Sequence, residues 1–291
     1  MSVPKLCNPS MGAPETCRSV HDVVKWASDL DVKPDGADGY FSRLWFRGHA
    51  DFSYELLPRV YRPLFGARAE SFWLDQRFYK LSDAIRSEPG AELERRRLNL
   101  ERMIISEFLQ AGGHLLERDN EIEAYFLAQH FGAPTRLLDW STNPLVALFM
   151  SVFDEDDAKN LSADGGVYAV DPTAHLPERE QPFQSILTPN HPYARDAIRV
   201  VMSWTDTDQI PHILPIRPNT RPGRVERQAS CFTLHSYRSN ETVNATLRRC
   251  RIPKEEKVRI RSVLSKLSIN QFTVYNTLDR LSRELSKTWR T

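Results

Sequence analysis

The spacing of apolar and polar residues predicts several helices. Ser19 is expected to cap a helix that ends before Pro34. The apolar side of that helix carries Val20, Val23, Val24 and Trp26. Residues 69–110 and 121–130 show the same helical period, and Gly132 and Pro134 end the second stretch.

Shorter apolar or alternating stretches predict strands. Residues 41–46 are rich in aromatic side chains and are followed by Gly48, so we expect a strand that delivers Arg47 to its end. Further strands are expected at residues 135–139, 165–170 and 224–235. Because helices and strands do not alternate in regular βαβ units, the pattern predicts an α+β fold.

Residues 144–153 form an almost wholly apolar stretch that begins with Pro144. Proline suits the first turn of a helix, and a helix that is apolar on all sides must be buried. We therefore expect residues 139–143, just before it, to lie deep in the fold. Polar side chains kept there need partners or a ligand.

The remaining stretches suggest the domain organisation. Residues 1–18 read as a flexible N-terminal tail, and residues 19–291 as one domain. Within it, residues 182–222 are rich in proline and look irregular, as lids and binding loops often do. Residues 252–285 are expected to form two closing helices.

Composition narrows the classes of protein. The 291 residues carry a formal net charge of +1, so any nucleic-acid or membrane-surface site must be local. No stretch approaches the ~18 apolar residues that span a bilayer, and the N-terminus lacks the apolar core of a signal peptide. The four cysteines are far apart in sequence and form no close pair. A cytoplasmic protein in a reducing compartment is expected, with no membrane partner and no metal site.

Two segments hold the candidate chemistry, and the first is Phe46-Arg47-Gly48. A guanidinium is a planar, bidentate ligand for phosphate or carboxylate, and glycine lets a ligand approach the backbone. The alternative is a surface arginine before a turn. If Arg47 is a clamp, Arg47→Ala should abolish binding and leave the fold intact.

The second segment runs from Gln129 to Asn143. We expect Arg47, Asp139 and Ser141 to meet in one concave site, because each lies at a strand end or a helix start. Arg136 and Asp139 are open to two interpretations, a buried ion pair that fixes the turn or direct ligands. His130 is either a general acid or a packed side chain, and Trp140 is either core or a stacking surface.

Together the two segments resemble the FRG domain family, named for its Phe-Arg-Gly motif. That family also carries the string Gln-His-x-Gly-x-Pro-Thr-Arg-Leu-Leu-Asp-Trp-(Ser/Thr)-x-Asn-Pro, which matches residues 129–144. Arg224, Gln228 and Phe232-Thr233 are similar to a third motif, Arg-x-x-x-Gln-x-Gly-x-Phe-Thr. Ser230 replaces its glycine, and Tyr275-Asn276 stands where the family commonly has Phe-Pro.

The order of these motifs is similar to that of ADP-ribosyltransferases, and this resemblance implies a mixed sheet core with additional helices. It also implies NAD as a substrate and the following residue roles. Arg47, Gly48, Asp139, Ser141, Thr142 and Asn143 would bind the nucleotide. Arg47, Glu226 and Gln228 would be catalytic, with Gln228 the positioned residue at the ribose and Glu226 in reserve.

The implied activity is that of an NAD-using ADP-ribosyltransferase or NAD glycohydrolase, in a toxin or a phage-defence effector. Breaking the glycosidic bond of NAD creates an oxocarbenium-like ribose, which needs negative charge beside it and a dry pocket. The acceptor would be a protein or a nucleic acid. The alternative is a non-catalytic module that binds a nucleotide or nucleic acid.

Overall fold

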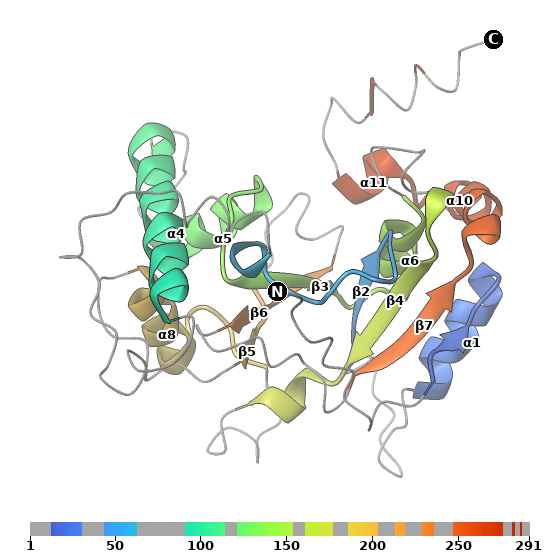
Figure 1. Ribbon diagram of the computed structural model, residues 1–291, viewed down its shortest axis with the longest axis horizontal. Coiled ribbons are helices and arrows are strands. Elements are labelled where there is room, and N and C mark those ends of the chain that lie inside the picture. Colours follow the sequence, from blue (N-terminus) through green and yellow to red (C-terminus); the bar gives the residue numbers. More distant parts are fainter. Residues whose placement is uncertain are drawn as a thin grey trace.

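The computed structural model describes residues 13–30, 44–62, 91–113, 121–153, 161–176, 186–202, 213–218, 229–235, 247–275, 281–282 and 286. In these residues the framework is a seven-stranded mixed sheet in the order β1-β7-β4-β2-β3-β6-β5 (Figure 1). The strands are β1 Glu15–Thr16, β2 Trp45–His49, β3 Leu137–Ser141, β4 Gly165–Val170, β5 Ile213–Ile216, β6 Ser230–His235 and β7 Arg248–Ile252. Only β1 and β7 pair in parallel, and the other neighbours are antiparallel. The expected α+β class is confirmed.

The helices of the described residues gather in two groups. They are α1 Val20–Leu30, α4 Ala91–Gly112, α5 Glu121–His130, α6 Pro144–Val152, α8 Pro192–Met202, α10 Lys257–Lys266 and α11 Gln271–Tyr275. Short 3-10 turns are η1 Arg59–Tyr61, η3 Pro172–His175 and η5 Lys254–Glu256. Figure 1 shows α4, α5 and α8 at one end of the sheet and α1, α6, α10 and α11 at the other, with β2 and β3 between them.

Both groups cover the same face of the sheet. On β2, Phe46 packs with α1, α6 and α10, while on β3 Leu137 packs with α5 and α8. Phe46 lies opposite Ser141, and side chains two residues apart on a strand share a face. Leu137, Asp139 and Ser141 therefore point to the same side of the sheet as Phe46.

The opposite face has its own core. Trp45, Leu138, Trp140 and Tyr168 pack together there, and Leu56 from the segment after β2 covers them. Arg47 follows Trp45 by two residues, so its side chain starts from this second face. Arg47 and Asp139 thus leave their strands toward opposite sides of the sheet.

Helix α6 is buried as its sequence predicts. Six of its nine residues are buried, including Leu148 and Phe149, because the sheet lies on one side and α1 and α10 on the other. Asn143 caps its N-terminus by accepting a hydrogen bond from the Leu145 amide at 2.9 Å. Pro144 occupies the first turn, where no amide hydrogen is needed.

Most other expected elements are present, with differences in detail. The Ser19 hydroxyl accepts from the Asp22 amide at the start of α1, but Val24 is exposed and does not belong to the buried side. Strand β2 continues through His49, so Arg47 lies in its middle rather than at its end. Of the strand expected at residues 224–235, the described part is β6; residues 219–228 lie outside the described residues.

The expectation of an irregular stretch at residues 182–222 is wrong for two parts of it. Residues 192–202 form α8, and residues 213–216 form β5. The frequent prolines masked the helical period of Ala194, Ala197, Ile198 and Val201, which are buried. Pro215 is compatible with β5 because that strand lies at the edge of the sheet.

The N-terminal segment joins the sheet at residues 15–17. Glu15 and Thr16 pair with β7, and the Cys17 amide donates to the carbonyl of Arg251 at 3.0 Å. This pairing brings Cys17 next to Cys250, and the two form a disulfide. The sequence interpretation, in which the four cysteines form no close pair, missed this contact, because separation in sequence does not decide which cysteines meet in the fold.

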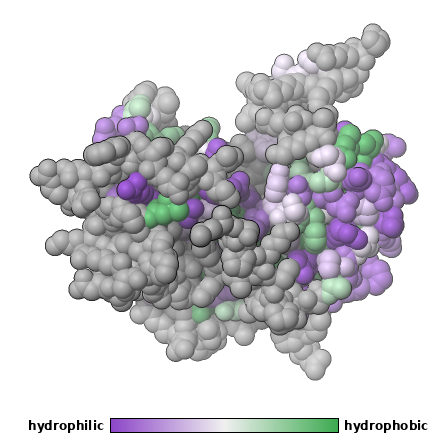
Figure 2. Space-filling view, viewed as in Figure 1, coloured by the Kyte–Doolittle hydropathy of each residue, from purple (hydrophilic) through white to green (hydrophobic). Residues whose placement is uncertain are grey.

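The surface over α1 and α10 is mostly hydrophilic (Figure 2). An apolar patch lies over α10, where Val258, Val263 and Leu267 are exposed. Within the described ranges, none of the helices has the length and apolar character to cross a membrane.

Candidate functional site

Strands β2 and β3 are neighbours that barely pair. Their ladder consists of one pair, Phe46 with Ser141, whereas β2 pairs with β4 along its whole length and β3 pairs with β6 along its whole length. The two strands therefore separate after Phe46. This separation lies at the centre of the sheet, between the two groups of helices.

Arg47 fills the opening between the two strands. Its Nη1 donates to the carbonyl oxygen of Asp139 at 2.6 Å and lies 2.9 Å from Oδ2 of the same residue. Because the two side chains leave their strands on opposite faces, the guanidinium must pass between β2 and β3. Only 10% of the Arg47 side chain is exposed. The contacts of Arg47 with Asp139 replace part of the backbone hydrogen bonding that is missing between β2 and β3.

His49 holds the other side of this guanidinium. Arg47 Nε donates to His49 Nε2 at 2.9 Å, and His49 Nδ1 lies 3.3 Å from the carbonyl oxygen of Tyr54. The ring is thus neutral, with its hydrogen on Nδ1. Burial, reinforced by the charges of Arg47 and Arg62, lowers the pKa of His49 to about 3. His49 is an acceptor for Arg47 rather than a proton donor at neutral pH, and the sequence interpretation gave it no role.

Asp139 is the reachable end of the ion pair. Its side chain is 57% exposed, although β3 is an interior strand of the sheet. Burial by the surrounding protein is the largest influence and acts to raise the pKa of Asp139. The charge of Arg47, the hydrogen bonds to the carboxylate and the charge of Arg62 together outweigh it, so the pKa lies below its usual value. The carboxylate is therefore ionised at neutral pH.

The turn after Asp139 is organised by its own side chains. Ser141 Oγ accepts from the Asn143 amide at 3.0 Å, and the Thr142 amide donates to the carbonyl of Ala229 at 3.1 Å. With the cap that Asn143 gives to α6, these bonds give Ser141 and Asn143 partners in a turn that is buried at Ser141 and half-buried at Asn143. Ser141 lies on the same face of β3 as Asp139, and it is buried.

Gly48 does not open the backbone to a ligand, contrary to the sequence interpretation. A Cβ placed on Gly48 would lie 1.8 Å from the carbonyl oxygen of Ala147, and one on Gly165 would lie 2.3 Å from that of Ser151. Both glycines let α6 rest directly on β2 and β4. Gly48 is needed for helix packing.

Arg136 pairs with Glu101 and not with Asp139. Arg136 Nε lies 2.7 Å from Glu101 Oε2, and both side chains are buried. Tyr125 also donates to Glu101 at 2.7 Å. The interpretation of Arg136 and Asp139 as a mutual ion pair is wrong. The position of Glu101 in the sequence could have indicated this pair. Glu101 shares a helical face with the apolar residues Leu98 and Ile105, so a carboxylate there needs a buried partner.

Trp140 and His130 were the other two side chains with two possible interpretations. Trp140 is part of the core, and its Nε1 donates to Thr233 at 2.9 Å. His130 is half-buried and makes an edge contact with the ring of Phe131. Glu226 and Gln228 lie outside the described residues.

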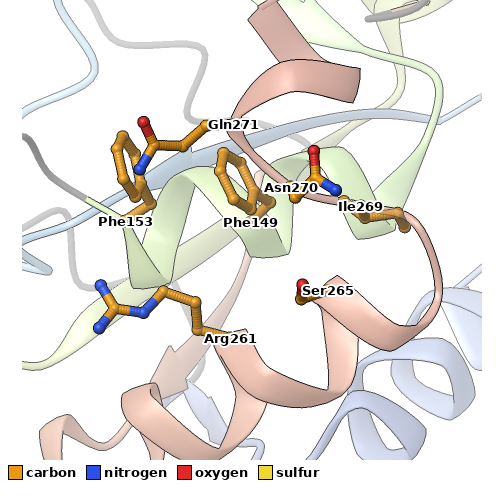
Figure 3. A pocket seen from close by; sticks show the side chains of 7 residues that line it. All are labelled: Phe149, Phe153, Arg261, Ser265, Ile269, Asn270 and Gln271. Atoms are coloured by element: carbon orange, nitrogen blue, oxygen red, sulfur yellow. The ribbon is translucent and has the colours of Figure 1, made fainter. Parts of the chain in front are cut away.

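A pocket between α6, α10 and α11 is too small to be the expected nucleotide site (Figure 3). Its volume is about 40 Å³, against ~300–1,000 Å³ for pockets that hold small-molecule ligands. Phe149, Phe153, Arg261, Ser265, Ile269, Asn270 and Gln271 line it. Across the described part of the chain, no group of three or more His, Cys, Asp or Glu residues is placed to hold a metal ion.

Comparison with known proteins identifies one family. Residues 42–160 match the model of the FRG domain. The match includes β2, β3 and α6, and therefore Arg47 and Asp139, but it ends before β4. No curated protein and no solved structure matches this chain.

Proposed function

We propose that this FRG-domain protein uses NAD as a substrate. The nicotinamide riboside end would lie at the separation of β2 and β3, beside Asp139. The protein would break the N-glycosidic bond and either transfer ADP-ribose to an acceptor or hydrolyse NAD. The observation that carries the proposal is an ionised, reachable carboxylate held by a buried arginine where two central strands part.

The chemistry matches the groups at this place. When the bond between ribose C1′ and the nicotinamide nitrogen breaks, its electron pair leaves with nicotinamide and positive charge develops on the ribose. A carboxylate fixed beforehand stabilises that charge without having to reorient during the reaction. Asp139 is fixed in this way by Arg47. Water or the acceptor then attacks C1′ and gives up a proton.

Two sequence arguments support the same activity. The FRG motifs follow the order of ADP-ribosyltransferase motifs, so an ADP-ribosyltransferase-like fold is part of the proposal. Gln228, with Glu226 in reserve, is proposed to contact the ribose, and it directly precedes Ala229, whose carbonyl accepts from Thr142. A cytoplasmic toxin or phage-defence effector is the role that suits such consumption of NAD.

The test is release of nicotinamide from NAD by the purified chain, with water, protein and nucleic acid offered as acceptors. Asp139→Asn should slow release by a factor on the order of 10², the typical loss when one group aimed at transition-state charge is removed. Asp29→Asn is the matched control, because Asp29 is an exposed carboxylate in an ion pair on α1. It should leave release unchanged.

The alternative is a non-catalytic module that binds a nucleotide or nucleic acid. It would replace the proposal if no acceptor supports nicotinamide release while the chain still binds nucleotides. Full turnover by Asp139→Asn would instead remove Asp139 from the chemistry.

A further inference from the structure

The segment between β2 and η1 crosses the separation of the two central strands. It begins at His49, which bonds the carbonyl of Tyr54. Leu56 then packs in one cluster with Trp45 of β2 and Leu138 of β3, and Val60 packs against Leu100 of α4. Part of residues 50–62 thus packs on the sheet face from which Arg47 starts, next to the separation of β2 and β3, and the sequence interpretation gave these residues no role.

Arg59 is anchored at the end of α5. Its Nη1 donates to the carbonyl oxygen of Gly132, which follows the helix in the left-handed region with φ of 89°. A Cβ on Gly132 would lie 3.3 Å from the same nitrogen, so glycine lets the guanidinium rest against the backbone. The residue before it, Phe131, is 71% exposed. An arginine and an open aromatic ring therefore flank the same turn.

Arg62 extends the positive charge toward the ion pair. It is exposed, and its Nε donates to the carbonyl of Leu57 at 3.3 Å. Burial lowers the pKa of Arg62 most, and the charges of Arg47 and Arg59 lower it further. The charge of Asp139 raises it. Arg47, Arg59 and Asp139 each lie close enough to Arg62 to act on its pKa, and Arg47, Arg59 and Arg62 are cations. Asp139 balances only part of this charge.

Arg47 has little capacity left for a ligand, since its Nε and Nη1 are engaged by His49 and Asp139. The exposed cations beside the site are Arg59 and Arg62. Guanidinium groups suit phosphate oxygens, and two of them match two adjacent phosphates better than a single anion. An exposed aromatic ring offers a surface on which a base can stack.

We propose that Arg59 and Arg62 bind the diphosphate of a nucleoside diphosphate group and that the Phe131 ring stacks on its base. This inference rests on the proposed function for the identity of the whole ligand. The ADP half of NAD would occupy this subsite, and the nicotinamide ribose would then reach Asp139.

Calorimetric titration of the full chain at fixed ionic strength tests the subsite, with ADP and inorganic pyrophosphate as probes. Arg62→Gln, alone and with Arg59→Gln, should weaken both probes by about tenfold or more, which corresponds to ~1.4 kcal/mol. Phe131→Ala should weaken ADP alone by about tenfold, within the range for loss of one stacked base. Arg259→Gln, at an exposed position of α10, and Leu267→Ala, at the exposed residue after α10, are the matched controls and should change neither affinity.

Three outcomes would overturn the subsite. In the first, the parent chain binds neither probe. In the second, Arg62→Gln and the double variant bind both probes as tightly as the parent. The third is a single-stranded oligonucleotide that binds far more tightly than ADP and is lost in the same variants, since the surface would then be a nucleic-acid site. Arg62→Gln keeps the test decisive if the double variant does not fold.

The subsite and the proposed function fail in different ways. If ADP binds through the arginines and the parent releases no nicotinamide, NAD cleavage is wrong and the subsite stands. If the parent cleaves NAD and Arg62→Gln and the double variant keep its KM, the subsite is wrong and the activity stands.

Discussion

Arg47 Nη1 lies 2.6 Å from the carbonyl oxygen of Asp139, although 92 residues separate the two in sequence. The same nitrogen is 2.9 Å from the Asp139 carboxylate. One buried guanidinium therefore joins two strands whose backbones have parted and holds a reachable carboxylate in place. Structure and proposed chemistry depend on the same contact.

Arg47→Ala should lower the free energy of unfolding by about 1–3 kcal/mol, because it leaves the Asp139 carbonyl and His49 Nε2 without their donor. Asp139→Ala should cost less, since that side chain is 57% exposed. Urea unfolding of both variants measures the difference. This order reverses the expectation from sequence, in which Arg47→Ala leaves the fold intact, and a larger loss in Asp139→Ala would contradict it.

Gly48→Ala should destabilise the fold by about 3 kcal/mol or more, because the new methyl group collides with the backbone of α6 and overpacking of this kind costs ~1–3 kcal/mol even where neighbours can adjust. Gly113→Ala is the matched control, since nothing lies within 4 Å of a Cβ at that position. Thermal unfolding of the two variants is the measurement. Similar midpoints would show that α6 does not rest on β2 as described.

Glu101→Ala should cost ~3–5 kcal/mol, the usual loss when one partner of a buried ion pair is removed. The charge of Arg136 would remain in the core without the Glu101 carboxylate, beside α8, whose Val201 carbonyl accepts from Arg136 Nη2. Asp29→Ala breaks the exposed pair with Lys25 and should change stability little, because solvent screens such surface pairs. Chemical denaturation compares the two. Equal losses would mean that Glu101 and Arg136 are not paired in the core.

Stability should fall as the pH drops below about 6.5, the ordinary value for histidine. Burial lowers the pKa values of His49 and His235 to about 3. Between about pH 6.5 and pH 3 these histidines bind protons in the unfolded chain but not in the folded chain. Their contribution to stability is therefore fully present above about pH 6.5 and is lost as the pH falls.

His49→Gln should flatten this dependence between pH 7 and pH 5.5, measured as the free energy of unfolding in urea. His21→Gln, at an exposed position of α1, is the control and should keep the slope of the parent. An unchanged slope in His49→Gln would place His49 in contact with solvent instead of between Arg47 and Tyr54.

Local patterns in the sequence predicted much of the fold. The apolar run of α6 required burial on all sides, and Pro144 after Asn143 marked its start; both follow from neighbouring residues alone. The period of α1 and the apolar strand β4 are of the same kind. The FRG motifs located the two segments that meet, because Arg47 and Asp139 lie inside them.

Only the tertiary structure decided which residues became partners. The sequence alone allowed Arg136 to pair with Asp139 or with an acidic residue far away in the chain. The packing of α4 on α5 made Glu101 its partner. Cys17 met Cys250 because β1 pairs with β7, and Gly48 faces α6 because that helix crosses β2. Sequence fixes the period and polarity of each element through short-range sterics and solvation. Ion pairs, disulfides and close backbone contacts depend on how distant elements pack, which no local pattern contains.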